Sequence, residues 1–221
     1  MQNYSQTNEF LSTVLQDDRD SIYFVGVKSG ERFKEFKAKK ANLVETITSC
    51  EGENIYVCIN GFTSAMGARD RNNLRQINGI FVDVDCHDME GEDLQIAIDM
   101  ALCKLNQAVM AGDMLEPTMV VHSGRGIHLY YVYAQSIPAR LKGGVPNAKG
   151  LKIHRYLTSV IYHSVRIAIA DTALTIDEAC SDLVRYVRVP GTSNTKAGSM
   201  CRIVKASNKV YTFDDLFGTA L

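Results

Sequence analysis

The hydrophobic and polar positions of the first 75 residues follow two different periods. Runs rich in β-branched and aromatic residues at 21–27 and 54–59 predict strands. Apolar residues at helical spacing predict a helix over 38–48, and a first helix that ends near residue 15 is expected from the capping residues ahead of it. Thr7 and Asn8 are candidate N-caps of the first helix. This part of the chain is therefore expected to mix helices and strands.

The middle of the chain carries the clearest pattern. Residues 80–85, IFVDVD, predict an apolar strand that ends in alternating carboxylates, and a helix of about 20 residues is expected after it. The runs 117–122 and 127–133 predict two further strands. The short glycine-containing turn at 123–126 joins them tightly enough to predict an antiparallel hairpin.

The last third begins with a loop, because residues 137–150 hold two prolines and a Gly-Gly pair. A long amphipathic helix is predicted over 151–170, followed by strands at 183–189 and 200–204 with a Pro-Gly-Thr-Ser-Asn turn between them. The order βαββ…αβ predicts an α+β fold. In it, helices pack on one face of a mostly antiparallel sheet.

Composition is that of an ordinary globular protein. The chain has 221 residues, 46% hydrophobic and 22% charged, and a chain of this size buries about 70% of its unfolded surface without a covalent or metal staple. Its six cysteines form no CxxC pair, which argues against a zinc ribbon and against a secreted disulfide framework. Its apolar runs are much shorter than the roughly 20 residues of a membrane span. We expect a soluble, cytoplasmic protein without a membrane partner.

Local charge is more informative than the net charge of −1. Basic residues gather in three places: at 32–40 with interleaved aromatics, ahead of the acidic strand, and after the hairpin. The second and third groups are Arg69, Arg71 and Arg75, and Arg140, Lys142, Lys149, Lys152 and Arg155. A single group of this kind is typical of a solvated face. Three groups around one acidic centre favour a groove that follows phosphates.

Asp83 and Asp85 form the first candidate site. Side chains at i and i+2 of a strand project from the same face, about 7 Å apart along the strand. Two like charges held this way are stabilised by a cation between them, and Mg²⁺ or Mn²⁺ prefers carboxylate oxygens. The alternative interpretation is a strand end that opens into a solvated acidic loop.

Residues 123–128, SGRGIH, form the second candidate site. The glycines allow close approach of the backbone to a ligand, and Arg125 offers a fork of donors suited to phosphate. His128 opens the next strand and can donate a hydrogen bond to a phosphate oxygen. The alternative is an ordinary glycine-containing hairpin with a structural histidine.

A third group follows Asp177. Arg185 and Arg188 lie on a predicted strand, and the turn after it brings Asn194 and Lys196 to its end. Two arginines, an amide and a lysine suit a triphosphate or a template backbone. An edge strand with solvated basic side chains is the competing interpretation.

These motifs together resemble the archaeo-eukaryotic primases (AEP). The hydrophobic-Asp-hydrophobic-Asp strand, the Ser-x-x-x-x-His hairpin and a later hydrophobic-Asp occur in the order that defines the family. SGRGIH followed by IDEACSDLVRYVRVPGTSNTK is similar to the primase–polymerases (PrimPol) of plasmids, phages and other mobile elements. Asp177 matches the later aspartate better than Asp171 or Asp182, because it follows an apolar residue and stands eight positions before Arg185. The resemblance covers roughly residues 54–205.

The resemblance implies an RRM-like, mostly antiparallel sheet with flanking helices beside a packed N-terminal α/β lobe. We expect a single catalytic domain over 1–221, with lobes of about 1–75 and 76–221. By resemblance, two Mg²⁺ or Mn²⁺ ions are held by Asp83, Asp85 and Asp177. Nucleotide contacts are expected from Ser123, Arg125, His128, Arg188 and Lys196. Nucleic-acid contacts are expected from Arg69, Arg71, Arg75 and Arg185.

The implied activity is template-directed nucleotidyl transfer on single-stranded DNA, as in a DNA primase or DNA polymerase. A primer 3′-hydroxyl would attack the α-phosphorus of an NTP or dNTP, helped by the two ions. A helicase or other replication or defence proteins are the expected protein partners. Two alternatives stay open: a metal-dependent nuclease, and an inactive RRM-like module that stacks bases on Tyr130, Tyr131 and Tyr133.

Overall fold

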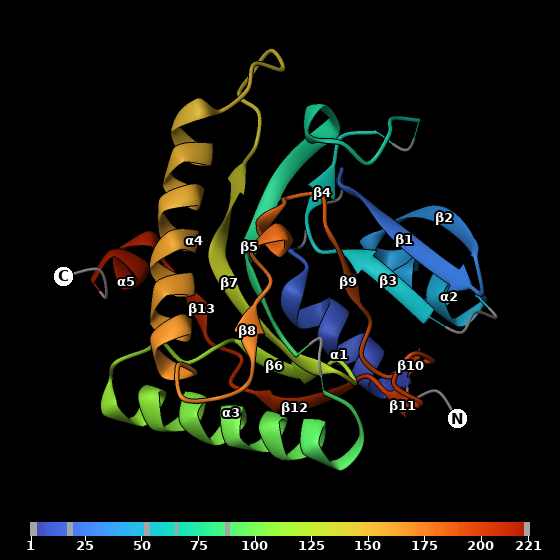
Figure 1. Ribbon diagram of the computed structural model, residues 1–221. Helices are drawn as coiled ribbons and strands as arrows, with labels where there is room; N and C mark the ends of the chain where they lie inside the picture. Colours follow the sequence, from blue (N-terminus) through green and yellow to red (C-terminus); the bar gives the residue numbers. More distant parts are fainter. Residues whose placement is uncertain (1–3, 17–19, 51–53, 65, 87–88, 219–221) are drawn as a thin grey trace.

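A computed structural model describes residues 4–16, 20–50, 54–64, 66–86 and 89–218 (Figure 1). The helices are α1 (Tyr4–Val14), α2 (Leu43–Thr48), α3 (Gly91–Ala111), α4 (Ala148–Ala168) and α5 (Phe213–Gly218). The 3-10 helices are η1 (Lys40–Asn42), η2 (Arg71–Asn73) and η3 (Glu178–Ser181). The strands are β1 (Ile22–Ser29), β2 (Arg32–Lys39), β3 (Asn54–Cys58), β4 (Gly61–Phe62), β5 (Leu74–Asp85), β6 (Met119–His122), β7 (Gly126–Pro138), β8 (Thr175–Ile176), β9 (Tyr186–Arg188), β10 (Ser193–Asn194), β11 (Ser199–Met200), β12 (Arg202–Ala206) and β13 (Val210–Tyr211).

Most strands of the described residues belong to one twisted sheet. Its main path is β12-β6-β7-β5-β4-β1-β3-β9, with β13, β2 and β8 attached at β7, β1 and β5. The pairing is antiparallel except between β13 and β7. This confirms the predicted α+β class and the predicted hairpin of β6 and β7. Strands from both expected lobes share the sheet, because β9 pairs with β3.

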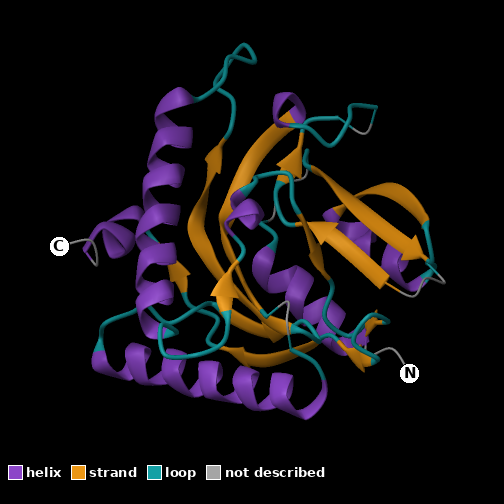
Figure 2. Ribbon diagram, viewed as in Figure 1, coloured by secondary structure: helices purple, strands orange, loops and turns teal. Residues whose placement is uncertain are grey.

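Alternation along β5 and β7 divides the core into two faces. On β5, Ile80, Val82 and Val84 contribute to the core that α3 and α4 cover, while Phe81 belongs to the core on the opposite face. Figure 2 shows α4 and α3 beside the sheet and α1 on its other side. The expectation of helices on one face only was therefore wrong. The apolar side of α1, with Phe10, Leu11 and Val14 buried, closes the second face.

Two predicted elements are shorter in the structure. The helix expected over 38–48 begins only at Leu43, because Ala38 and Lys39 continue β2 and pair with Tyr23 and Ile22 of β1. The strand expected over 183–189 is only three residues long (β9), because residues 182–185 connect the end of η3 to the start of that strand. The basic stretch 32–40 therefore lies mainly on a strand that pairs with β1 along its whole length.

The sheet buries three tyrosines completely. Tyr130, Tyr131 and Tyr133 have no exposed surface. Their rings are therefore unable to stack on bases, which removes the feature on which the RRM-like binding module depended. No helix in the described part of the chain combines the length and the hydrophobicity needed to cross a bilayer.

Candidate active site

Pairing between β5 and β8 brings two distant carboxylates together. Val84 pairs with Ile176, and the backbone N–H of Asp177 donates a hydrogen bond of 2.9 Å to the carbonyl oxygen of Asp83. Asp177 then caps η3, because its Oδ1 accepts the N–H of Ala179 at 3.0 Å. The two side chains are 20% and 27% exposed, so both face solvent in part. A strand of only two residues thus sets the geometry of the acidic centre.

Cys180 completes this centre. The turn of η3 returns the chain so that the Cys180 thiol lies 3.1 Å from Asp177 Oδ2 and 3.4 Å from Asp83 Oδ2. One ligand atom from each of the three residues lies within 4.8 Å of the others. Burial, together with the Asp83 charge, raises the pKa of this thiol far above its usual range. Sequence reasoning missed Cys180, although its spacing of three from Asp177 was the available signal.

The donor set fits a divalent cation. Two carboxylate oxygens suit Mg²⁺ or Mn²⁺, and the thiol adds affinity for softer ions. Among the described residues, Asp85 does not belong to the group whose ligand atoms all lie within 4.8 Å of one another. It shares the face of Asp83, and its Oδ1 accepts the backbone N–H of Cys86 at 2.7 Å. The structure therefore brings together Asp83 and Asp177, two of the three predicted ligands. The third, Asp85, is the next residue on the same face of β5.

His128 lies directly across the sheet from Asp83. The two residues are register partners of β7 and β5, and His128 Nε2 is 3.6 Å from Asp83 Oδ1. On its other side, Nδ1 lies 3.3 Å from the Tyr130 hydroxyl, and the ring packs edge-on against Phe81. Burial lowers the pKa of His128, opposed by the Asp83 carboxylate. The imidazole is thus fixed at the edge of the acidic centre.

The turn between β6 and β7 is held by the later Pro-Gly-Thr segment. The Ser123 N–H donates to the Gly126 carbonyl at 2.9 Å, and Gly124 takes a φ of 103°, which favours glycine. Asn194 Nδ2 donates a buried 2.7 Å hydrogen bond to the Ser123 carbonyl. Arg125 turns toward Glu90, with 3.5 Å between Nη1 and Oε1. Two motifs that lie about 70 residues apart in sequence therefore form one unit.

The basic residues after Asp177 divide into three environments. Arg185 joins the acidic centre, where its Nη2 lies 3.4 Å from Asp177 Oδ2. Arg188 is held by Asn54 at 2.7 Å and by the Tyr56 hydroxyl at 3.1 Å. Lys196 is exposed between β10 and β11. Lys196 is therefore open to a ligand that approaches the turn fixed by Asn194, whereas Arg188 is already engaged by its neighbours.

The group ahead of β5 is spread along the protein. Arg69 lies over the Tyr186 ring and pairs with Glu35. Arg71 pairs with Asp182 at 3.0 Å. Arg75 pairs with Asp20 near the start of β5, about 26 Å along the strand from Asp83 at 3.3 Å per residue. These arginines therefore do not converge on the acids.

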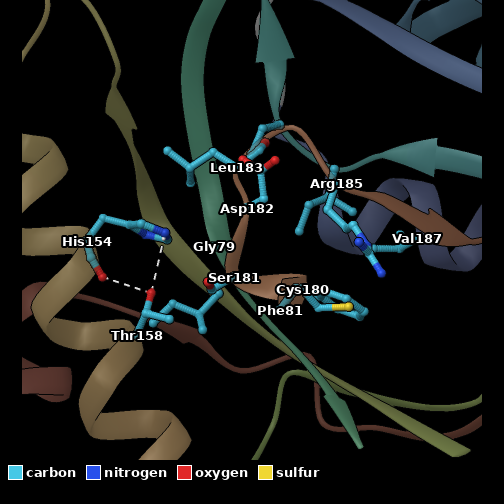
Figure 3. A pocket seen from close by; sticks show the side chains of 13 residues that line it. Gly79, Phe81, His154, Thr158, Cys180, Ser181, Asp182, Leu183, Arg185 and Val187 are labelled. Carbon is cyan, nitrogen blue, oxygen red and sulfur yellow. Dashed lines mark hydrogen bonds between the residues drawn. The ribbon is translucent and has the colours of Figure 1, made fainter. Parts of the chain in front are cut away.

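A small cavity separates the acidic centre from α4 (Figure 3). Cys180 and Arg185 line it on one side, and His154 and Thr158 of α4 on the other (Figure 3). Its volume is about 20 Å³, which suffices for a water molecule and excludes a nucleotide. A ligand larger than water therefore has access to the carboxylates only from the solvent side.

The fold is shared with known replication enzymes. No family model matches the chain. It is similar to the AEP domain of the cyanophage S-2L primase–polymerase, with a TM-score of 0.62 and 16% identity over 99% of this chain and 98% of that one. It is also similar to the primase RepB′ (TM-score 0.53, 13% identity, 97% of this chain and 62% of that one). The RepB′ catalytic domain in complex with initiator DNA gives the same TM-score and identity, over 97% and 94%.

The protein thus has the catalytic-domain fold of archaeo-eukaryotic primases, which confirms the resemblance noted in its sequence. A curated relative is the "Replication protein" of Clostridium perfringens, 24% identical over 164 residues and 74% of this chain. The chain spans about a third of that relative's length, 35%.

Proposed function

We propose that the protein is a nucleotidyltransferase that extends a primer, or starts one, on single-stranded DNA. The observation that carries this proposal is the meeting of Asp83 and Asp177 across β5 and β8, opposite His128, on the fold of primase–polymerase AEP domains. The substrates are an NTP or dNTP, a template strand and a primer 3′-hydroxyl. The name of the RepB′ complex, a primase with initiator DNA, supports a DNA template.

Each group has a distinct task. Asp83, Asp177 and Asp85 would hold the divalent ions, which when bound lower the pKa of the attacking hydroxyl and neutralise charge on the leaving pyrophosphate. His128, buried beside Asp83, would direct its Nε2 N–H to the incoming phosphates while Nδ1 accepts from the Tyr130 hydroxyl. Ser123, Arg125, Arg188 and Lys196 add positive charge and hydrogen-bond donors around the triphosphate. Rate enhancement comes mainly from positioning and electrostatics.

Arg185 has a role at the boundary of the site. Its guanidinium lies at Asp177, where it offsets the repulsion between the carboxylates while no cation is bound. With a cation held by the carboxylates, the guanidinium of Arg185 would instead contact the template or the triphosphate. Arg69, Arg71 and Arg75 remain proposed nucleic-acid contacts away from the acidic centre.

Incubation with labelled single-stranded DNA, with and without an annealed primer, tests the proposal in Mg²⁺ and in Mn²⁺. Metal-dependent lengthening of the primer, lost in Asp83→Asn, is the expected result. Products formed without a primer would add primase activity. Shortening of the strand would instead identify a nuclease, and strand binding without synthesis in any metal would identify an inactive binding module.

A further inference from the structure

A second hollow, about 400 Å³ in volume, lies where the first half of α4 faces η2 and the loop after β7. These three elements meet at the same end of the sheet (Figure 1). Each contributes one arginine to its lining: Arg71 from η2, Arg140 from the loop and Arg155 from α4. We call this hollow the arginine pocket. It is far larger than the water-sized cavity beside Cys180.

The arginine pocket carries excess positive charge. Arg71 is neutralised by Asp182, with 3.0 Å between Nη2 and Oδ1. Within the described residues Arg140 has no carboxylate partner: the carbonyl oxygens of Gly144 and Asn72 hold it, so it is positioned while its charge stays uncompensated there. Arg155 is exposed on α4. Three cations against one carboxylate favour an anion, and guanidinium groups suit phosphate oxygens.

The walls between these arginines are largely apolar. Leu74, Ala139, Pro146, Leu151 and Leu183 contribute to them. A pocket of this volume lies in the range of about 300–1,000 Å³ that accommodates small organic ligands. Apolar walls with arginines suit a ligand that joins a flat apolar ring to a phosphate, as a nucleotide does.

The arginine pocket adjoins the candidate active site through η3. Ser181 and Leu183 line the pocket, and Cys180, one residue earlier, contacts Asp83 and Asp177. Asp182, between them, binds Arg71. A ligand in the pocket therefore touches the segment that shapes the acidic centre, while remaining separate from the carboxylates.

We propose that the arginine pocket binds one nucleotide unit, with its phosphate at Arg140 and Arg155 and its base against the apolar walls. The expected source is a nucleotide of the single-stranded DNA, which rests on the proposed function; a free nucleotide offers the same chemistry. The pocket would anchor the strand beside the acidic centre without taking part in the reaction.

Binding of fluorescein-labelled oligodeoxythymidine, followed by anisotropy in EDTA, tests this site without the metal centre. Arg155→Ala is expected to weaken binding about three- to tenfold. It should also lower the salt dependence by about 0.7, the slope of one phosphate contact on a single strand. Arg166→Ala removes the same side chain from an exposed position of the same helix outside the pocket lining, and serves as the control. The double variant Arg140→Ala/Arg155→Ala should lose more than Arg155→Ala alone.

Calorimetry with deoxythymidine monophosphate distinguishes the two sources. Weaker strand binding by Arg155→Ala would identify a nucleotide of the DNA strand as the ligand. An effect of Arg155→Ala on binding of the mononucleotide alone would identify a free nucleotide. Either result supports the pocket. If Arg155→Ala matches Arg166→Ala in both measurements, with circular dichroism confirming that it is folded, the proposal is overturned. Asp83→Asn should retain the Arg155 effect, so failure of the proposed chemistry is distinguishable from failure of the pocket.

Discussion

The N–H of Asp177 donates a hydrogen bond of 2.9 Å to the carbonyl oxygen of Asp83, and this bond connects two residues that are 94 positions apart. It extends the two-residue pairing of β8 with the end of β5. Because backbone atoms make this contact, it occupies none of the side-chain oxygens of the two aspartates. The acidic centre is thus a product of strand pairing, and substitutions of the side chains should leave that pairing intact.

Cys180 is expected to give the acidic centre affinity for soft cations. Cd²⁺ added to the wild-type protein should produce the ultraviolet charge-transfer band of a thiolate ligand, because thiolates select such ions. Cys180→Ser should lose this band and keep Mg²⁺-dependent synthesis, since both carboxylates remain. Cys103→Ser, which removes the exposed thiol of α3, is the control and should keep the band. An unchanged band in Cys180→Ser would contradict the role of this thiol.

Asn194 should contribute substantially to stability. Asn194→Ala removes a buried hydrogen bond and leaves the Ser123 carbonyl without that donor, which costs about 1–3 kcal/mol. Urea denaturation measures the change. Ser159→Ala removes an exposed hydroxyl that bonds only within its own helix, and should stay within about 0.5 kcal/mol of the wild type. Equal stability of the two variants would show that Asn194 does not join the two motifs.

Gly126 is expected to resist substitution. A Cβ at this position would lie 2.2 Å from the Val84 carbonyl oxygen, so β7 would have to move away from β5 beside Asp85. We predict that Gly126→Ala lowers the free energy of unfolding by about 3 kcal/mol. Gly218→Ala, with open space around its Cβ, is the matched control and should change stability by less than about 1 kcal/mol. A stable Gly126→Ala variant with full activity would contradict this close approach.

Acid should destabilise the protein through His154. Burial lowers the pKa of this histidine to about 4, below the value of about 6.5 in an unfolded chain. The unfolded state therefore binds the proton first, and stability falls as the pH drops from about 6.5 toward 4. For this residue the loss between pH 7 and pH 5 is about 2 kcal/mol. His154→Gln should show a correspondingly smaller loss in urea denaturation, and an identical pH dependence in both proteins would refute the prediction.

Local patterns were sufficient to predict the elements that carry the candidate site. The strand with Asp83 and Asp85, the hairpin with His128 and the two long helices each have a clear period or turn signal within one short stretch. The fold class followed from their order. The structural similarity to primase catalytic domains confirms that prediction.

Features that depend on long-range pairing were not predictable in this way. β8 has only two residues and no periodicity, yet it is the strand that delivers Asp177. Cys180 reaches the carboxylates because η3 turns immediately after that strand. The second face of the sheet is covered by α1, whose buried side chains complete a core formed by residues far along the chain. In each case the position is set by a partner that the local sequence does not encode.

The comparison of Asp177→Asn with Asp171→Asn in a primer-extension assay separates a catalytic carboxylate from a surface one. Both substitutions remove one carboxylate charge; Asp171 is exposed and pairs only weakly with Lys104 at 3.7 Å. Asp177→Asn is expected to lower metal-dependent incorporation by about 100-fold or more, because about 3 kcal/mol of transition-state stabilisation is lost. Asp171→Asn should extend the primer at the wild-type rate. Full activity in a folded Asp177→Asn protein would show that Asp83 and Asp177 do not form the catalytic centre.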